Sequence, residues 1–170
     1  MAIAFLVLVV VGLVGQMRLW PHALQGHTAP DFTLPKQTRG RWTLSDEDAR
    51  VILLQFWEVG CKPCMVALPR LERIHQWAET QDKPVVVYCV HVGDPQEPIT
   101  DLWAEQQLTM PVLSDLMGTV AETFRVNSYP QTFVIADGQV EQVHVGTRSL
   151  HVAKLQQQIE SLLRTGNGKP

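Results

Sequence analysis

The stretch that decides the fold is Gln55-Phe56-Trp57-Glu58-Val59-Gly60-Cys61-Lys62-Pro63-Cys64. The apolar run at 51–54 leads into it and predicts a strand, and a helical pattern follows it. The two cysteines therefore fall where the strand gives way to the helix. A helix N-terminus carries unpaired N–H groups and a partial positive charge, which stabilise a thiolate and lower its pKa. The spacing thus predicts a redox-active dithiol in which Cys61 attacks and Cys64, one turn further on, resolves the mixed disulfide.

The same pair also fits half of a structural zinc site, which takes four ligands. The third cysteine, Cys89, lies inside an apolar run, and no second Cys-x-x-Cys occurs in the chain. The sequence therefore favours a working dithiol over zinc, and no metal ligand is assigned. Cys89 is predicted to be a small buried hydrophobic residue, with a resolving role as the alternative.

Further residues around the pair resemble the thioredoxin superfamily. Trp57 lies before the pair, Pro63 inside it and Pro69 after it, and a distant Tyr129-Pro130-Gln131-Thr132-Phe133 completes the pattern. The resemblance runs from about residue 29 to 163 and is closer to the membrane-tethered, TlpA/ResA-like thiol-disulfide oxidoreductases. It implies an α/β, thioredoxin-like fold with a central mixed β-sheet flanked by helices. It also implies an N-terminal β-hairpin extension and an N-terminal membrane helix.

The resemblance implies roles for individual residues. The Tyr129–Pro130 bond is expected to be cis and to pack against the dithiol, which leaves the Tyr129 backbone free to pair with an extended substrate peptide. An ordinary trans proline at the start of a strand is the alternative. Lys62 is expected to support the thiolate weakly, and Pro63 suits a first helical turn. Trp57 is expected to shield the pair and shape the docking surface, or to be a plain core tryptophan.

The chain departs from these relatives where the proton acceptor of Cys64 is expected. Gln55 stands in the position of the buried acid of thioredoxins, and Ala67 in a position where ResA-like proteins often carry a glutamate. Gly60 replaces the aromatic residue that is common just before the first cysteine. Glu58 is the only nearby acid and is expected to face water. The proton path of Cys64 therefore stays open, with Gln55 as a residue that could orient a water.

Length and composition bound the class of protein. The chain has 170 residues, of which 45% are hydrophobic and 18% charged, so it suits one globular domain plus a short extra segment. A net charge of −3 gives no reason to expect a nucleic-acid partner. Three cysteines are too few for a disulfide scaffold.

The N-terminal segment is strongly apolar. Residues 1–20 are expected to be a membrane anchor or a signal segment, and the absence of a persuasive cleavage site favours an uncleaved anchor over a cleaved signal or a buried soluble helix. Arg18 follows the segment, which favours a cytoplasmic domain, whereas the resemblance implies an inner-membrane anchor with the domain on the periplasmic or extracytoplasmic side. We follow the resemblance. The expected organisation is then a solvated linker at 21–30, a thioredoxin-like domain at 31–165 and a flexible tail at 166–170.

Hydrophobic periodicity and turn residues predict the remaining elements. Strands are expected at 29–34, 41–44, 51–57, 84–92, 110–113, 131–136 and 139–145. Helices are expected at 61–78, 97–107, 116–124 and 149–163, and residues 45–48 form a turn or a short helical start.

Three functions remain open at this stage. The first is a monomeric, cofactor-free thiol-disulfide oxidoreductase that reduces extracytoplasmic client proteins; the resemblance implies electrons from a membrane reductase and a link to cytochrome c biogenesis. The second is a copper-binding or copper-delivery protein, in which Cys61 and Cys64 bind Cu(I) with one of His75, His91 or His144. The third is a docking module with weak catalysis, suggested by the missing acids. The direction of electron flow depends on the reduction potential and is not fixed by the sequence.

Overall fold

The structure is a computed structural model that describes residues 22–94 and 99–165. Its strands are β1 Thr33–Pro35, β2 Arg41–Thr43, β3 Val51–Trp57, β4 Val85–Val92, β5 Val112–Asp115, β6 Gln131–Ala136 and β7 Gln139–Val145. Its helices are the 3-10 turn η1 Leu44–Asp46, α2 Lys62–Thr80, α3 Ile99–Glu105, α4 Thr119–Thr123 and α5 Val152–Thr165.

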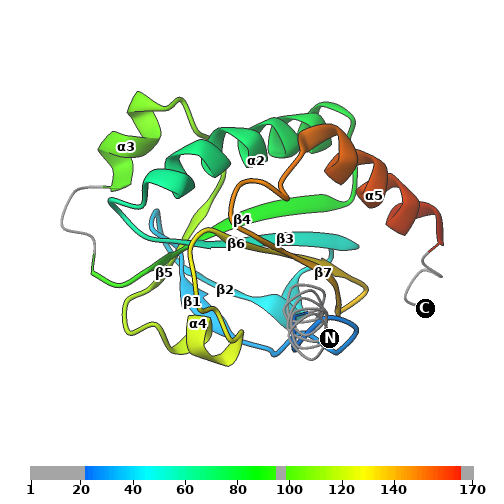
Figure 1. Ribbon diagram of the computed structural model, residues 1–170, viewed down its shortest axis with the longest axis horizontal. Helices are drawn as coiled ribbons and strands as arrows, with labels where there is room; N and C mark the ends of the chain where they lie inside the picture. The colour runs from blue at the N-terminus through cyan, green and yellow to red at the C-terminus, as the bar shows by residue number, and fades with distance from the viewer. Residues whose placement is uncertain (1–21, 95–98, 166–170) are drawn as a thin grey trace, which may run out of the picture.

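A five-stranded sheet lies at the centre, in the order β5-β4-β3-β6-β7 (Figure 1). β3, β4 and β5 are parallel, whereas β6 runs antiparallel to β3 and β7 antiparallel to β6. Every residue of β3 is buried, as its continuous apolar run predicts for a central strand. The predicted α/β fold, a mixed sheet flanked by helices, is confirmed.

Helices and the hairpin cover the sheet on both faces. α2, α3 and α5 lie on one face, where Leu68 and Leu71 of α2 and Ile159 of α5 join one apolar cluster (Figure 1). The antiparallel β1–β2 hairpin and α4 lie on the other face, where Trp42 and Phe124 join a second cluster. The predicted N-terminal hairpin is therefore confirmed, and it packs as part of the domain.

The segment before the hairpin differs from the prediction. Within the expected solvated linker at 21–30, Gly26 N–H donates to Val140 O at 2.7 Å, and Ala29 N–H donates to Gly138 O at 2.9 Å. Val140 N–H returns a bond to His27 O at 2.9 Å. These bonds satisfy backbone groups along the open edge of β7, which would otherwise be unpaired. The described part of the segment, 22–30, is thus packed edge structure of the domain.

Two elements after α3 are shifted from their predicted positions. The strand expected at 110–113 is β5, Val112–Asp115, and the helix expected at 116–124 is α4, Thr119–Thr123. The Asp115 carboxylate accepts the Ala121 N–H at 2.8 Å, which fixes the start of α4. Gly118 takes up a left-handed backbone with φ of +70°, so the chain turns there before the helix begins.

The expected anchor at 1–20 and the expected tail at 166–170 lie outside the described residues. Between residues 22 and 165, apart from 95–98, the structure contains no helix with the length and apolarity that a bilayer crossing requires.

Candidate active site

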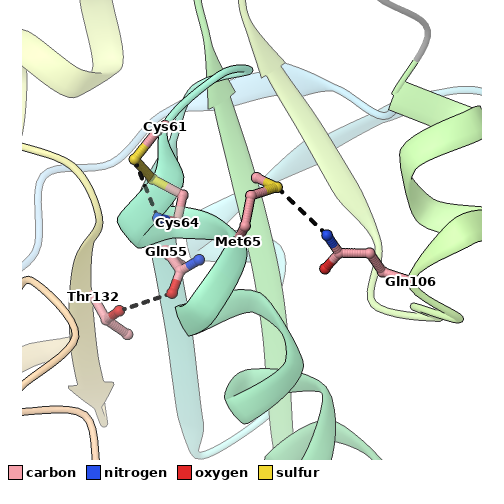
Figure 2. The surroundings of a disulfide bond; sticks show 6 residues. All are labelled: Gln55, Cys61, Cys64, Met65, Gln106 and Thr132. Atoms are coloured by element: carbon pink, nitrogen blue, oxygen red, sulfur yellow. Dashed lines mark hydrogen bonds between the residues drawn. A yellow bond between two sulfur atoms is a disulfide. The ribbon is translucent and has the colours of Figure 1, made fainter.

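The two cysteines of the motif meet at the N-terminus of α2. Cys61 is the N-cap residue and is partly exposed, whereas Cys64 is fully buried in the first turn. The two residues form a disulfide with a Cα–Cα distance of 5.2 Å (Figure 2). The Cys64 N–H also points at Cys61 Sγ at 3.2 Å. A thiolate at Cys61 after reduction would face this N–H and the positive end of the helix, which is the arrangement that activates a cysteine.

The turn between β3 and α2 explains the residues around the pair. β3 ends at Trp57, and Gly60 adopts a φ of +81°, a conformation that side-chain-bearing residues rarely take. This backbone explains why a glycine stands where the aromatic residue of the relatives was expected. Pro63 lies in the first helical turn, where a missing N–H leaves no intrahelical bond unmade.

The Tyr129–Pro130 peptide bond is cis, as the resemblance implied. Pro130 directly precedes β6, whose first residue, Gln131, pairs with Phe56 near the end of β3. The cis bond therefore lies at the same end of the central strands as the dithiol. Pro130 O is already used, since it accepts the Gly146 N–H at 2.8 Å.

Tyr129 stands half-buried beside this bond and packs against both apolar clusters. Burial raises the pKa of its phenol, and the carboxylates of Glu58 and Asp115 raise it further. This interaction indicates that Glu58, which is exposed as predicted, lies on the Tyr129 side of the site.

Trp57 does not contribute to a docking surface. It has no exposed area, and its ring packs at centroid distances of 5.0 Å from His91 and 5.1 Å from Trp103. The expectation that it shapes the docking surface is wrong, and the alternative of a core tryptophan is confirmed. Lys62, by contrast, is exposed next to Cys61, so its charge acts on the site through solvent.

The two positions where the relatives carry an acid are occupied here by buried, uncharged side chains. Gln55 and Ala67 are both fully buried. The buried carboxylate of α2 is instead Glu72, which was not singled out from the sequence. It accepts bonds from Thr109 and Met110, on the segment before β5, and so lies away from the dithiol.

Cys89 is a buried free thiol, as predicted. It has no exposed surface, and its Sγ lies 3.9 Å from Met110 Sδ. Burial raises its pKa well above the usual range, and the Glu72 charge adds to this. Cys89 is therefore kept as a thiol and takes no part in exchange.

The histidines considered for copper are dispersed. His75 lies on α2 with its Nε2 3.4 Å from Glu79, His91 is buried against Trp57, and His144 lies on β7 under α5. Among the residues that the structure describes, no three His, Cys, Asp or Glu side chains come together as a metal site.

The sheet order, the dithiol at the start of α2 and the cis proline opposite it define a thioredoxin-like protein with a redox-active cysteine pair. Sequence comparison agrees with this class. Residues 25–143 match the AhpC/TSA family. The chain is 30% identical to thioredoxin-like protein YneN of Bacillus subtilis over 124 residues, which are 72% of each chain. It is 32% identical to the thiol-disulfide oxidoreductase ResA of Geobacillus kaustophilus over 123 residues, 72% of this chain and 70% of that one.

Solved structures give the same result. A Chlorobium tepidum protein provisionally described as the thiol:disulfide interchange protein DsbE superposes with a TM-score of 0.72 at 29% identity, over 82% of this chain and 97% of that chain. The exposed lipoprotein thioredoxin Etrx1 of Streptococcus pneumoniae superposes with a TM-score of 0.63 at 28% identity, over 78% and 99%. The chain belongs to the AhpC/TSA family. With its Cys61–Cys64 pair, it is a thiol-disulfide oxidoreductase.

Proposed function

We propose that this protein reduces disulfides in extracytoplasmic client proteins, with Cys61 as the attacking sulfur and Cys64 as the resolving one. The observation that carries the proposal is the unequal exposure of the pair: Cys61 is partly exposed at the tip of α2, whereas Cys64 is fully buried behind it. A client sulfur can therefore reach Cys61 first. Cys64 is then held close enough to displace the client from the mixed disulfide.

Apolar side chains beside the site support a protein client. Val66, in the first half of α2, is 50% exposed, and Val145, which pairs with Gln131 next to the cis proline, is 51% exposed. Val66 lies two residues after Cys64, and Val145 lies opposite the residue that follows the cis proline. Exposed apolar residues at such positions favour association with an extended or unfolded peptide segment.

The relatives support a location outside the cytoplasm. The similarity to ResA proteins and to an exposed lipoprotein thioredoxin fits an extracytoplasmic domain tethered by the apolar segment at 1–20. On that side of the membrane, electrons would be supplied by a membrane-bound dithiol donor. In this proposal the dithiol, the two sulfurs of the client and this donor account for the whole reaction, with no further cofactor.

Trapping tests the proposal. The Cys64→Ala variant should be expressed in the cell envelope of the source organism. It should accumulate mixed disulfides between Cys61 and client proteins, because the Cys64 sulfur that would release the client is gone. Cys89→Ala is the matched control, since it also removes one thiol but leaves the pair intact. Adducts found equally with both variants, or with neither, would refute the assignment of roles. The wild-type protein should also reduce insulin, and Cys61→Ser should not.

A further inference from the structure

A row of polar side chains crosses the sheet under α2 and α5. Gln55 of β3 pairs in register with Thr132 of β6, and Thr132 pairs with His144 of β7, so all three side chains project from one face. They are 0%, 2% and 7% exposed. Leu53 and Val134 flank the row on this face, which is mostly apolar but also carries the buried His91 beside Trp57. Three polar residues aligned across an apolar core call for an explanation.

The hydrogen bonds of the row are incomplete within the protein. Thr132 Oγ1 donates to Gln55 Oε1 at 3.3 Å, which leaves the Gln55 amide nitrogen as the free end of that side chain. Among the described residues, the Gln55 Nε2 has no protein partner within hydrogen-bonding geometry. The His144 ring nitrogens have none with well-aligned geometry either, although the Gln158 side chain and the Ser149 backbone lie close enough to interact with the ring. An unsatisfied buried polar group costs about 1–3 kcal/mol. Proteins meet this cost with ordered water that bridges such groups.

The row runs across the sheet from the strand that leads to the dithiol to a strand at the surface. At one end, Gln55 lies between Leu53 and Trp57 on the face where Cys64 is packed, and Figure 2 draws Gln55 and Thr132 among the surroundings of the disulfide. At the other end, His144 lines a pocket of about 500 Å³ between β7 and α5. The rim of this pocket includes the exposed side chains of Arg148, His151 and Lys154.

Burial and the positive charges around His144 both favour the neutral form of its ring. Burial lowers its pKa; the Gln158 side chain and the Ser149 backbone oppose this in part, and the charge of His151 adds to the lowering. Arg148 and Lys154 of the pocket are positive as well, and from α2 Arg70 reaches the same loop, where it donates to Thr147 O and Leu150 O. No carboxylate of the described part of the chain lines this pocket. A neutral imidazole has a lone pair that can accept a proton. The same surroundings disfavour the imidazolium, so a proton taken up here would pass on quickly to the water of the pocket.

We propose that the hydrated row Gln55–Thr132–His144 is the proton route of Cys64, and that His144 takes up the Cys64 proton when the mixed disulfide is resolved. The proposal rests on the proposed exchange function. It supplies the base that the buried acid of thioredoxins would otherwise provide. Gln55 and Thr132 are positioning residues in this route: the Thr132 hydroxyl donates to Gln55 Oε1 and so fixes the direction in which the Gln55 amide N–H groups order the water.

The step balances as follows. The Cys64 thiol loses its proton to His144 through water, while the Thr132 hydroxyl stays bonded to Gln55 Oε1. The Cys64 sulfur then attacks the Cys61 sulfur and forms the Cys61–Cys64 disulfide, while the Cys61–client bond breaks and its electron pair leaves with the client sulfur. The client thiolate takes a proton from solvent, and the His144 imidazolium returns its proton to water in the α5 pocket. The client disulfide is reduced by two electrons and the protein dithiol is oxidised.

Stopped-flow kinetics with an aromatic disulfide reagent separate the two steps in the full-length reduced protein. The first coloured thiolate reports the attack by Cys61, and the second reports resolution by Cys64. His144→Gln should leave the first phase unchanged and slow the second about tenfold or more near neutral pH, because a positioned base is lost. The second phase should then rise with pH into the alkaline range, as for an unassisted thiol. Thr132→Val should likewise slow the second phase and leave the first unchanged. Thr132→Ser, which keeps the hydroxyl, should have a second phase as fast as that of the wild type.

His75→Gln is the matched control, since it makes the same replacement on α2, outside both the row and the pocket. It should change neither phase. The proposal is overturned if His144→Gln leaves the second phase within about twofold of wild type, or slows it at every pH without changing its profile, which would mark a structural role. If His144→Gln does not fold, Thr132→Val alone decides on the same criteria. A wild-type protein that lacks the first or second phase would instead refute the proposed function itself.

Discussion

Glu72 is expected to hold α2 against the segment that leads into β5. This carboxylate is 5% exposed and accepts the Thr109 N–H at 2.9 Å, the Thr109 hydroxyl at 2.6 Å, the Met110 N–H at 3.2 Å and the Gln76 amide at 2.9 Å. In Glu72→Ala, the exposed Gln76 turns to solvent. The two backbone N–H groups cannot, and each costs about 1–3 kcal/mol when left unpaired.

Part of that cost is offset because the buried charge disappears together with its desolvation penalty. We therefore expect Glu72→Ala to lower the free energy of unfolding by about 2–4 kcal/mol, and Glu72→Gln, which keeps one carbonyl acceptor, by about half as much. Urea unfolding at neutral pH measures both. Glu79→Gln is the control on the same helix; its exposed ion pair with His75 should contribute at most about 0.5 kcal/mol.

The same carboxylate gives a pH dependence with a defined sign. Burial raises the Glu72 pKa, but the bonds from Thr109, Met110 and Gln76 outweigh burial and hold the pKa below its ordinary value of 4.5. The stabilisation is therefore fully present above that value and is lost as the pH falls through the lower pKa of the folded state. The difference between wild type and Glu72→Gln should shrink on acidification. The account would be refuted if the difference in unfolding free energy between wild type and Glu72→Gln stayed constant over the acid range. It would also be refuted if Glu72→Ala lost no more unfolding free energy than Glu79→Gln.

Two further predictions concern charged groups, one on the hairpin side of the sheet and one beside the dithiol. Burial, together with the charge of Glu47 and a hydrogen bond to it, raises the pKa of Tyr88 to about 12. In a Tyr129→Phe background, Glu47→Gln should lower the Tyr88 pKa measured by tyrosinate absorbance, but not to the ordinary value, because burial remains; an unchanged pKa would contradict the assignment. Lys62 is exposed, so Lys62→Gln should slow the first exchange phase less than about fivefold at low salt and have no effect at high salt. A large effect that salt does not screen would show direct contact with the reacting sulfur.

The sequence predicts the parts of this fold that depend on strong local patterns. The apolar run of β3 and the motif at the start of α2 place the dithiol, and the cis bond at Tyr129–Pro130 follows from the resemblance, since local physics alone favours a trans bond. Those features lie at element ends where residue types are strongly restricted. Element boundaries after α3 are less well predicted, because the Asp115 side chain fixes the start of α4 through a contact made only in the folded state.

Tertiary contacts decide the features that the sequence does not reveal. Whether Trp57 is a core or a surface residue depends on His91 and Trp103, which come from other elements. His144 was considered only as a copper ligand, because nothing in its local sequence indicates that strand register places it beside Thr132. Alternation along β7 does not reveal it either, because a β-bulge opposite Val134 and Ile135 puts Val140 and His144 on opposite faces of the sheet.

The central claim is that Cys61 is the activated sulfur at the tip of α2, with Cys64 and Cys89 shielded. Alkylation of the fully reduced protein with a limiting amount of iodoacetamide, followed by peptide mass spectrometry, tests it directly. The account predicts that Cys61 is modified first, that it reacts even in mildly acidic solution, and that Cys89 reacts only after unfolding. Modification of Cys64 before Cys61, or equal rates at all three cysteines, would contradict it.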